Sequence, residues 1–328
     1  MHRMIGDAGI LSPMVANAVR DSYHRTARRT LLLFDELAAC LRALGAVGVP
    51  VIVLKGAALI ETVYHNIALR PMGDVDLLVR RSDLATTHRT LAGLGYALAG
   101  METHPGALIE YENELTFHKP GHRDTYMDVH WSLFDSPYYQ ARVAMDWFWD
   151  TAQPATIAGV PALVLGPEAL TIHLCGHLAL HHMATGLLWW HDIIAVLKHH
   201  RGEMDWPLLL SRITDYGLLP PVRPVLTRAV EEWAAPMPLD VLGALRDRQH
   251  SNEELRVYAE LTSGDRPAGR RFWTDLTSTP GWRRRVRFAR THLLPSPAYM
   301  RNRYAIRHPL LLPLYYPYRW LRGVRGLR

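Results

Sequence analysis

The sequence predicts an α+β protein, with a small mixed β-sheet flanked by helices in residues 1–160 and a mainly helical domain in residues 161–328. Three observations predict this arrangement. Short apolar runs alternate with segments of helical periodicity in the first half. Helical periodicity alone continues from Pro167 onward. The composition changes between residues 155 and 166, which is where we place the junction between the two domains.

The first half begins with a long helix and then alternates strands with helices. Residues 14–47 carry leucines and Phe34 at helical spacing, until Gly45, Gly48 and Pro50 end the helix. A turn signal at residues 119–121 separates the last two strands of this half. We expect strands at 51–54, 75–79, 96–98, 115–118 and 126–131, and helices at 57–64 and from the N-cap candidate Asp83 to residue 94.

The second half is predicted to be a succession of helices. Pro167 suits the first turn of a helix, where its missing N–H is not needed. We see no internal repeat. The expected helices cover residues 168–183, 187–199, 207–216, 221–233, 239–245 and 252–261.

Composition indicates a globular protein: 48% of the 328 residues are apolar. The N-terminal stretch has no apolar core suited to a signal peptide, and no run approaches the roughly 20 apolar residues of a membrane-spanning helix. Cys40 and Cys175 lie in apolar helical contexts and lack metal-ligand spacing, so we interpret both as buried thiols. These features together favour a cytoplasmic location.

The net charge is distributed unevenly. Residues 281–328 hold twelve arginines and no acidic residue; since the whole chain carries +6, residues 1–280 carry −6. Such a tail is compatible with binding RNA, an anionic surface or a phosphorylated substrate, or with wrapping the acidic body of its own chain. Pro309, Pro313 and Pro317 argue against a regular helix at 309–324, so we favour docking of its aromatic residues onto the helical domain over a membrane-surface helix.

Three carboxylates are the candidate catalytic and metal-binding residues. Asp74 and Asp76 are separated by one residue, and side chains at this spacing on a strand point to the same side. Two like charges so placed repel unless a cation lies between them, and Mg²⁺ prefers such oxygen ligands. Asp128 lies within another apolar run, where a lone carboxylate is costly unless it is paired or binds a metal. Lys55-Gly56, at the end of an earlier apolar run, is a candidate phosphate-binding turn.

These motifs resemble those of the nucleotidyltransferase superfamily, which includes DNA polymerase beta-like enzymes. The chain is most similar to a bacterial family of uncharacterised nucleotidyltransferases with the pattern LKG, then RPxxDxDLLV, then D/E-x-H-W. The three motifs occupy residues 54–56, 70–79 and 128–131, and less specific likenesses occur at 174–177, 190–192 and 295–304. The turn departs from the wider superfamily, because Gly56 is followed by Ala57 rather than by Gly or Ser.

The resemblance implies a nucleotidyltransferase-like fold and an enzyme that moves an NMP, with AMP from ATP as the first choice, onto an acceptor hydroxyl or phosphate. Asp74, Asp76 and Asp128 would bind Mg²⁺ or Mn²⁺. Lys55, Gly56 and Arg70 would contact the phosphates of ATP or another NTP, although Arg70 could instead pair with a carboxylate. The acceptor would be a small molecule, a modified peptide or RNA. The alternative is an inactive nucleotide-sensing or partner-binding protein on the same fold.

A histidine stripe is a separate metal candidate. His173, His177 and His181 recur every four residues, with His182 beside them, and this spacing can chelate Zn²⁺. No Glu or Cys completes a recognisable zinc motif. We therefore favour histidines that are buried or that line a cleft. Residues 189–192 (WWHD) are interpreted mainly as core, with support of a nucleobase or acceptor as the alternative.

Overall fold

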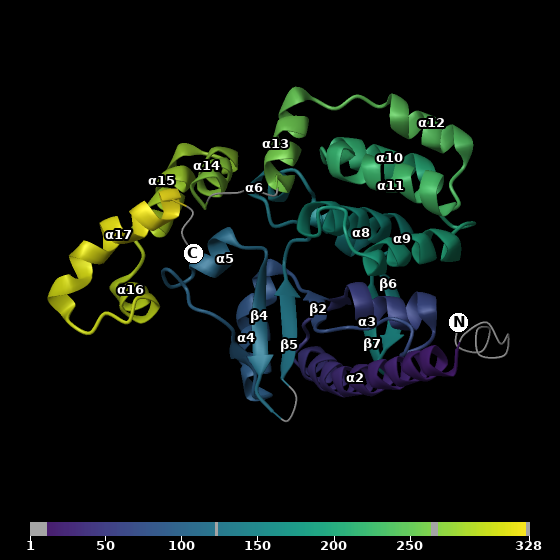
Figure 1. The fold of residues 1–328 in the computed structure, drawn as a ribbon, viewed down its shortest axis with the longest axis horizontal. Helices are drawn as coiled ribbons and strands as arrows, with labels where there is room; N and C mark the ends of the chain where they lie inside the picture. The colour runs from purple at the N-terminus through teal and green to yellow at the C-terminus, as the bar shows by residue number, and fades with distance from the viewer. Residues whose placement is uncertain (1–11, 122–123, 264–267, 326–328) are drawn as a thin grey trace. The chain divides into compact units, whose positions relative to one another are not determined.

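The computed structural model describes residues 12–121, 124–263 and 268–325. It confirms the predicted α+β class (Figure 1). The described residues divide into two compact units: unit 1 within Met1–Leu98, Thr116–Trp131 and Thr151–Gly166, and unit 2 within Ala99–Leu115, Ser132–Asp150 and Pro167–Arg328. The N-terminal stretch considered for a signal peptide lies outside the described residues. No helix in the described part of the chain is both long and apolar enough to span a membrane.

Unit 1 is built on a mixed sheet with the strand order β3-β4-β5-β2-β1-β7-β6. β1 pairs antiparallel with β2 and parallel with β7, and β2 pairs parallel with β5. The hairpins β3–β4 and β6–β7 are antiparallel. The strands are β1 (Ile52–Val53), β2 (Val75–Leu78), β3 (Ala97–Leu98), β4 (Glu114–Lys119), β5 (Thr125–His130), β6 (Gln153–Ile157) and β7 (Val160–Val164).

The helices of unit 1 form because their apolar residues face the sheet. In α2 (Pro13–Ala46), Ser12 accepts a hydrogen bond from the backbone of Val15 as N-cap, and the buried residues of its C-terminal half recur at helical spacing. α2 packs against β7 and α4 (Leu84–Gly93), and its buried thiol belongs to Cys40, as expected. α3 (Lys55–Leu59) follows β1 directly and continues into a π-helical turn at Ile60–Tyr64.

Residues 153–164 overlap the stretch where we placed a domain junction and form the β6–β7 hairpin. Our sequence analysis assigned no strand to these residues. β6 is the edge strand of the sheet, and an edge strand tolerates a proline such as Pro154, since its outer N–H groups have no partner in the ladder.

Unit 2 is predominantly helical. α8 and α11 pack together, and α9, α10 and α13 pack on one or both of them. Cys175 is buried in α8. The helices are α5 (Ala107–Tyr111), α6 (Pro137–Gln140), α7 (Met145–Asp150), α8 (Pro167–His181), α9 (Leu187–His199), α10 (Trp206–Asp215), α11 (Leu219–Trp233), α12 (Leu239–Asp247), α13 (Asn252–Thr262), α14 (Ala268–Ser278), α15 (Trp282–Leu293), α16 (Pro297–Arg303) and α17 (Leu312–Arg325).

The expectation that proline prevents a regular helix in the tail is wrong. α17 is continuous through Pro317, and a 3₁₀ turn at Pro309–Leu311 leads into it. Pro309 and Pro313 occupy first turns, where no N–H donor is needed, so only the interior proline removes a helical hydrogen bond. Within unit 2, the Tyr316 hydroxyl of α17 donates to Pro295 O, between α15 and α16, at 2.8 Å.

Candidate functional site

The pairing of β2 with β5 brings two of the predicted carboxylates side by side. Asp76 on β2 lies opposite Asp128 on β5 in the parallel register, one pair among four successive ones. Apolar neighbours such as Val75, Leu77 and Val129 are almost fully buried and fix this register, because a one-residue slip would turn them to the opposite face. The two acids that are 52 residues apart in the sequence therefore share one face of the sheet.

Asp74 lies just outside the strand. β2 begins at Val75, so Asp74 occupies the bend that precedes it and is exposed. Partial desolvation raises the pKa of Asp74, and the negative charge of Asp76 raises it further. This pair consequently carries an unbalanced negative charge that a cation would stabilise.

Lys55 is the cation nearest to the carboxylates. Its Nζ lies 2.6 Å from Oδ1 of Asp76, and both side chains are largely buried, with exposed fractions of 14% and 9%. The backbone of Lys55 has a φ of 45°, in the left-handed region that side chains other than glycine seldom adopt. The turn after β1 thus holds a strained backbone that directs Lys55 toward β2 rather than to the surface.

His130 is a site residue that our sequence analysis did not single out. Its Nε2 lies 3.0 Å from the same Oδ1 of Asp76, and its side chain is only 4% exposed. Burial alone would raise the pKa of Asp76, but the charge of Lys55 and the hydrogen bond from His130 outweigh it and hold that pKa far below the usual range. The signal was present in the sequence: His130 is two residues from Asp128, so both face the same side of β5.

Gly56 and Arg70 lie together beneath this turn. A Cβ on Gly56 would lie 2.8 Å from Cγ and Sδ of Met72 and 3.1 Å from an Arg70 nitrogen, so only glycine fits without displacement. Arg70 is buried and donates to Pro71 O at 2.6 Å. Its charge also contributes to lowering the pKa of Asp74, although desolvation and Asp76 prevail.

Arg29 positions the two segments that carry the acids, a role that our sequence analysis did not predict. From α2 its guanidinium donates to Gly73 O at 2.9 Å, next to Asp74. It also donates to Asp124 O, at 3.5 and 3.4 Å, just before β5 begins. One side chain thereby ties the bend before β2 to the turn before β5.

The histidine stripe of α8 belongs to unit 2, whereas the carboxylates belong to unit 1. His173 is buried, the rings of His177 and His181 stack at 5.0 Å, and Nε2 of His182 lies 3.0 Å from Nε2 of His177. His182 stacks in turn on Trp189. Among the described residues, no group of three or more His, Cys, Asp or Glu side chains is arranged to hold a metal ion by itself.

Comparison with known proteins addresses the family directly. The sequence profile of a family described as uncharacterised nucleotidyltransferase matches residues 3–233, well over half of the chain. The chain belongs to this nucleotidyltransferase family. A solved structure of an antigenic nucleotidyltransferase-like protein from Paracoccidioides brasiliensis is similar to it, with a TM-score of 0.40 and 13% sequence identity over 68% of this chain and 97% of that chain. No curated protein matches the sequence.

Within this member of the nucleotidyltransferase family, the matched region contains every candidate site residue described above. α12 to α17 lie beyond residue 233 and are therefore outside the matched region. The family assignment supports the fold and a transferase activity on NTPs, and it applies to the part of the chain that carries the carboxylates.

Proposed function

We propose that the protein is a metal-dependent nucleotidyltransferase that moves an NMP, most simply AMP from ATP, onto an acceptor and releases pyrophosphate. The observation that carries this proposal is the register of Asp76 opposite Asp128, with Asp74 two residues before Asp76 and a lysine turn beside them. Carboxylates on two neighbouring strands, with a third in the bend before one of them, suit transfer through a metal-bound triphosphate.

The residues present fit Mg²⁺ or Mn²⁺ in donor chemistry. Mg²⁺ is usually held by one or two carboxylates together with waters and substrate phosphates, so a complete protein cage is not needed. Desolvation raises the pKa of Asp74 and the charge of Asp76 raises it further, and a cation bound at the carboxylates would oppose both effects. Lys55 and His130 both contact Oδ1 of Asp76, and Oδ2 is the oxygen that would bind a metal. When bound, the metal would neutralise triphosphate charge and acidify the acceptor hydroxyl.

The chain's own residues then have separate tasks. Asp74 and Asp76 bind the metal, and Asp128 completes the site and accepts the proton of the acceptor hydroxyl. The acceptor oxygen forms a bond to the α-phosphorus of the NTP while the bond from this phosphorus to the bridging α–β oxygen breaks, so the electron pair leaves with pyrophosphate. Lys55 holds Asp76 ionised and supplies positive charge beside the triphosphate, as does Arg70.

Gly56 leaves the backbone of the turn open to the triphosphate. The acceptor is a small molecule, a modified peptide or RNA, and we assign its selection to the helical domain of residues 161–328. Because the turn lacks the hydroxyl of the wider superfamily, backbone N–H groups would take a larger share of phosphate binding.

The competing function is nucleotide binding without transfer. It gains some support from Ala57 in place of Gly or Ser. A protein that only senses a nucleotide has no need of a proton acceptor at position 128. A comparison of the wild type with Asp128→Asn therefore separates the two functions. If the protein only senses a nucleotide, both proteins should bind it with the same affinity, and neither should form product.

Titration with Mn²⁺ followed by electron paramagnetic resonance tests the proposed site. In the presence of an ATP analogue that cannot be cleaved between the α- and β-phosphates, the wild-type protein should bind Mn²⁺ at least tenfold more tightly than Asp74→Asn or Asp76→Asn. Asp35→Asn, which changes an exposed acid on α2, should bind like the wild type. Equal Mn²⁺ affinity in all four proteins would refute the proposed metal site.

A further inference from the structure

A large cavity is lined only by residues of unit 2, whereas the residues assigned to catalysis belong to unit 1. Its volume is about 980 Å³, which is within the range of small-molecule sites. Parts of α14, α15, α16 and α17 line it, together with residues in or next to α5 and α6. α14, which contributes to the lining, packs against both α6 and α17. Figure 1 shows the ribbon of these helices.

Aromatic rings that remain accessible characterise the cavity. Trp273 and Trp320 both line it and are 62% and 43% exposed, which is unusual for so large an apolar surface. The indole N–H of Trp320 donates to Leu293 O at 2.7 Å, so its polar atom is satisfied while its ring remains accessible. Two accessible indoles in one cavity are suited to stacking on a planar ring.

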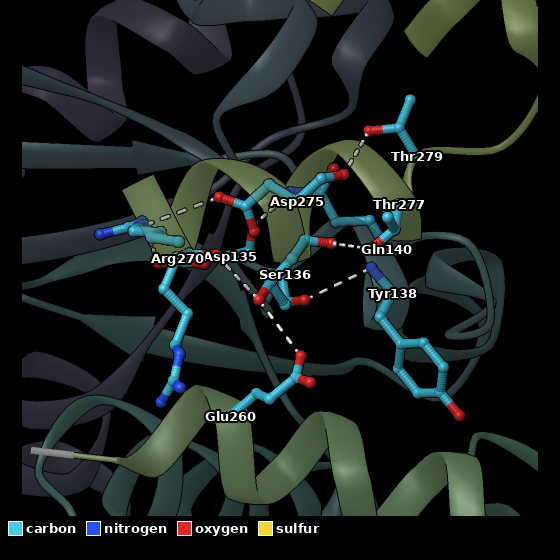
Figure 2. Close-up of polar contacts among 11 residues, drawn as sticks. Asp135, Ser136, Tyr138, Gln140, Glu260, Arg270, Asp275, Thr277 and Thr279 are labelled. Carbon is cyan, nitrogen blue, oxygen red and sulfur yellow. Dashed lines mark hydrogen bonds and ion pairs between the residues drawn. The ribbon is translucent and has the colours of Figure 1, made fainter. Parts of the chain in front are cut away.

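The acidic side of the cavity carries its own counter-charge. Arg271 lies 3.3 Å from Asp135 and 3.7 Å from Asp275, both of which also line the cavity. Figure 2 shows the polar contacts of these two acids. Burial raises the pKa of Glu112, and the charge of Asp135 raises it further. Arg271 therefore compensates part of the negative charge on this side of the cavity.

The lining arginines of α16 and α17 differ from Arg271 in their ion pairs. Within the part of the chain that the structure describes, no carboxylate lies within ion-pair distance of Arg303, Arg319 or Arg322, all of which line the cavity. Arg319 instead lies 5.6 Å above the ring of Tyr299. Burial lowers the pKa of His292, and the charges of Arg319 and Arg271 lower it further, as expected in a positive field. These arginines offer donors to an anion, in a tail without any acidic residue.

We propose that this cavity binds a nucleoside monophosphate unit, with its base stacked against Trp273 or Trp320 and its phosphate held by Arg319 and Arg303. A ligand with only a ring would leave the arginines unused, and a ligand with only a phosphate would leave the indoles exposed. The unit comes either from a free nucleotide or from single-stranded RNA, since both present the same base and phosphate. The site is formed mainly by residues 269–323, outside the matched family region, and the proposal does not depend on the transferase activity.

The test is calorimetric titration of the full chain in EDTA, which removes metal-dependent binding at the carboxylates. The probes are AMP, adenosine, ribose 5-phosphate and a six-residue oligoadenylate RNA. AMP should bind at least fivefold more tightly than adenosine or ribose 5-phosphate. An RNA affinity at least tenfold above that of AMP and falling with salt would identify RNA as the source; otherwise the source is a free nucleotide.

Matched variants assign the binding to this cavity. The double change Trp273→Ala/Trp320→Ala should weaken AMP binding by about fivefold to a hundredfold, whereas Trp282→Ala, an equally exposed tryptophan outside the cavity, should not. Arg303→Gln should weaken it by roughly fivefold, unlike Arg301→Gln on the same helix. The proposal is wrong if neither AMP nor RNA binds, if ribose 5-phosphate or adenosine binds as tightly as AMP, or if lining and control variants behave alike. The Asp76→Asn protein should bind AMP like the wild type, so failure here and failure of the proposed catalysis are distinguishable.

Discussion

Replacement of Lys55 by Met removes the ion pair that stabilises Asp76 and leaves a buried carboxylate with His130 as its remaining donor. The pair is short, at 2.6 Å, and both side chains are at most 14% exposed. Loss of one partner of a buried pair costs roughly 3–5 kcal/mol, and the remaining hydrogen bond from His130 places the expected cost near the lower end, at about 3 kcal/mol. Lys119→Met provides a matched control. Its pair with Glu36 is about one third exposed, so we expect a loss of about 1 kcal/mol or less.

Urea unfolding measured at several pH values tests this magnitude. The folded pKa of Asp76 is lowered, so its contribution to stability is present above the unfolded pKa of about 3.9 and is lost as the pH falls toward the folded value. Without Lys55 the folded pKa rises. The difference in unfolding free energy between wild type and Lys55→Met should therefore be full at pH 7 and shrink below about pH 4.

Adding Asp76→Asn to Lys55→Met should restore at least about 1 kcal/mol, because the uncompensated charge is gone. A Lys55→Met protein that loses no more stability at pH 7 than Lys119→Met, or a double variant that is less stable than Lys55→Met alone, would refute this electrostatic account of the turn.

Three further predictions concern residues other than the three carboxylates. Arg29→Met should lower the unfolding free energy by about 1–2 kcal/mol and weaken Mn²⁺ binding with the ATP analogue, because both acid-bearing segments lose a shared donor; unchanged metal affinity would contradict this role. Native protein should not react with a disulfide reagent at pH 8, since burial raises the pKa of Cys40 to about 12 and that of Cys175 even further, whereas urea should release two reactive thiols; fast reaction in the native state would contradict it. Gly186→Ala should cost about 2 kcal/mol or more in thermal or urea unfolding, because φ is 91° and the new methyl would lie 2.3 Å from the Trp189 ring; a stable variant would show that this ring moves freely.

The sequence predicted the parts of the fold and site that depend on local pattern. The spacing of Asp74 and Asp76, and the position of Asp128 in an apolar run, indicated acids on neighbouring strands because strand periodicity and burial are local properties. The sequence did not predict features that depend on tertiary contacts. The guanidinium of Arg29 reaches two carbonyls 44 and 95 residues away, a contact that no sequence pattern in α2 indicates. His130 was within reach of the same periodicity argument.

Proline misled our reading of the tail. We expected Pro317 to argue against a regular helix, whereas α17 continues through it. A proline inside a helix removes one backbone hydrogen bond. Our sequence analysis also assigned no strand to residues 153–164, which form the β6–β7 hairpin. The low helix and strand propensity of proline does not by itself tell a proline within an element from one that ends it.

The most direct test of the central claim is product analysis with ATP labelled at the α- or the γ-phosphate, with Mg²⁺ or Mn²⁺ and water as the simplest acceptor. Transfer of a nucleotide predicts AMP and pyrophosphate as products, at a rate reduced at least a hundredfold in Asp128→Asn and unchanged in Asp35→Asn. Formation of ADP and inorganic phosphate would contradict nucleotidyl transfer. Release of AMP that is equally fast in Asp128→Asn would contradict the role assigned to the carboxylates of β2 and β5.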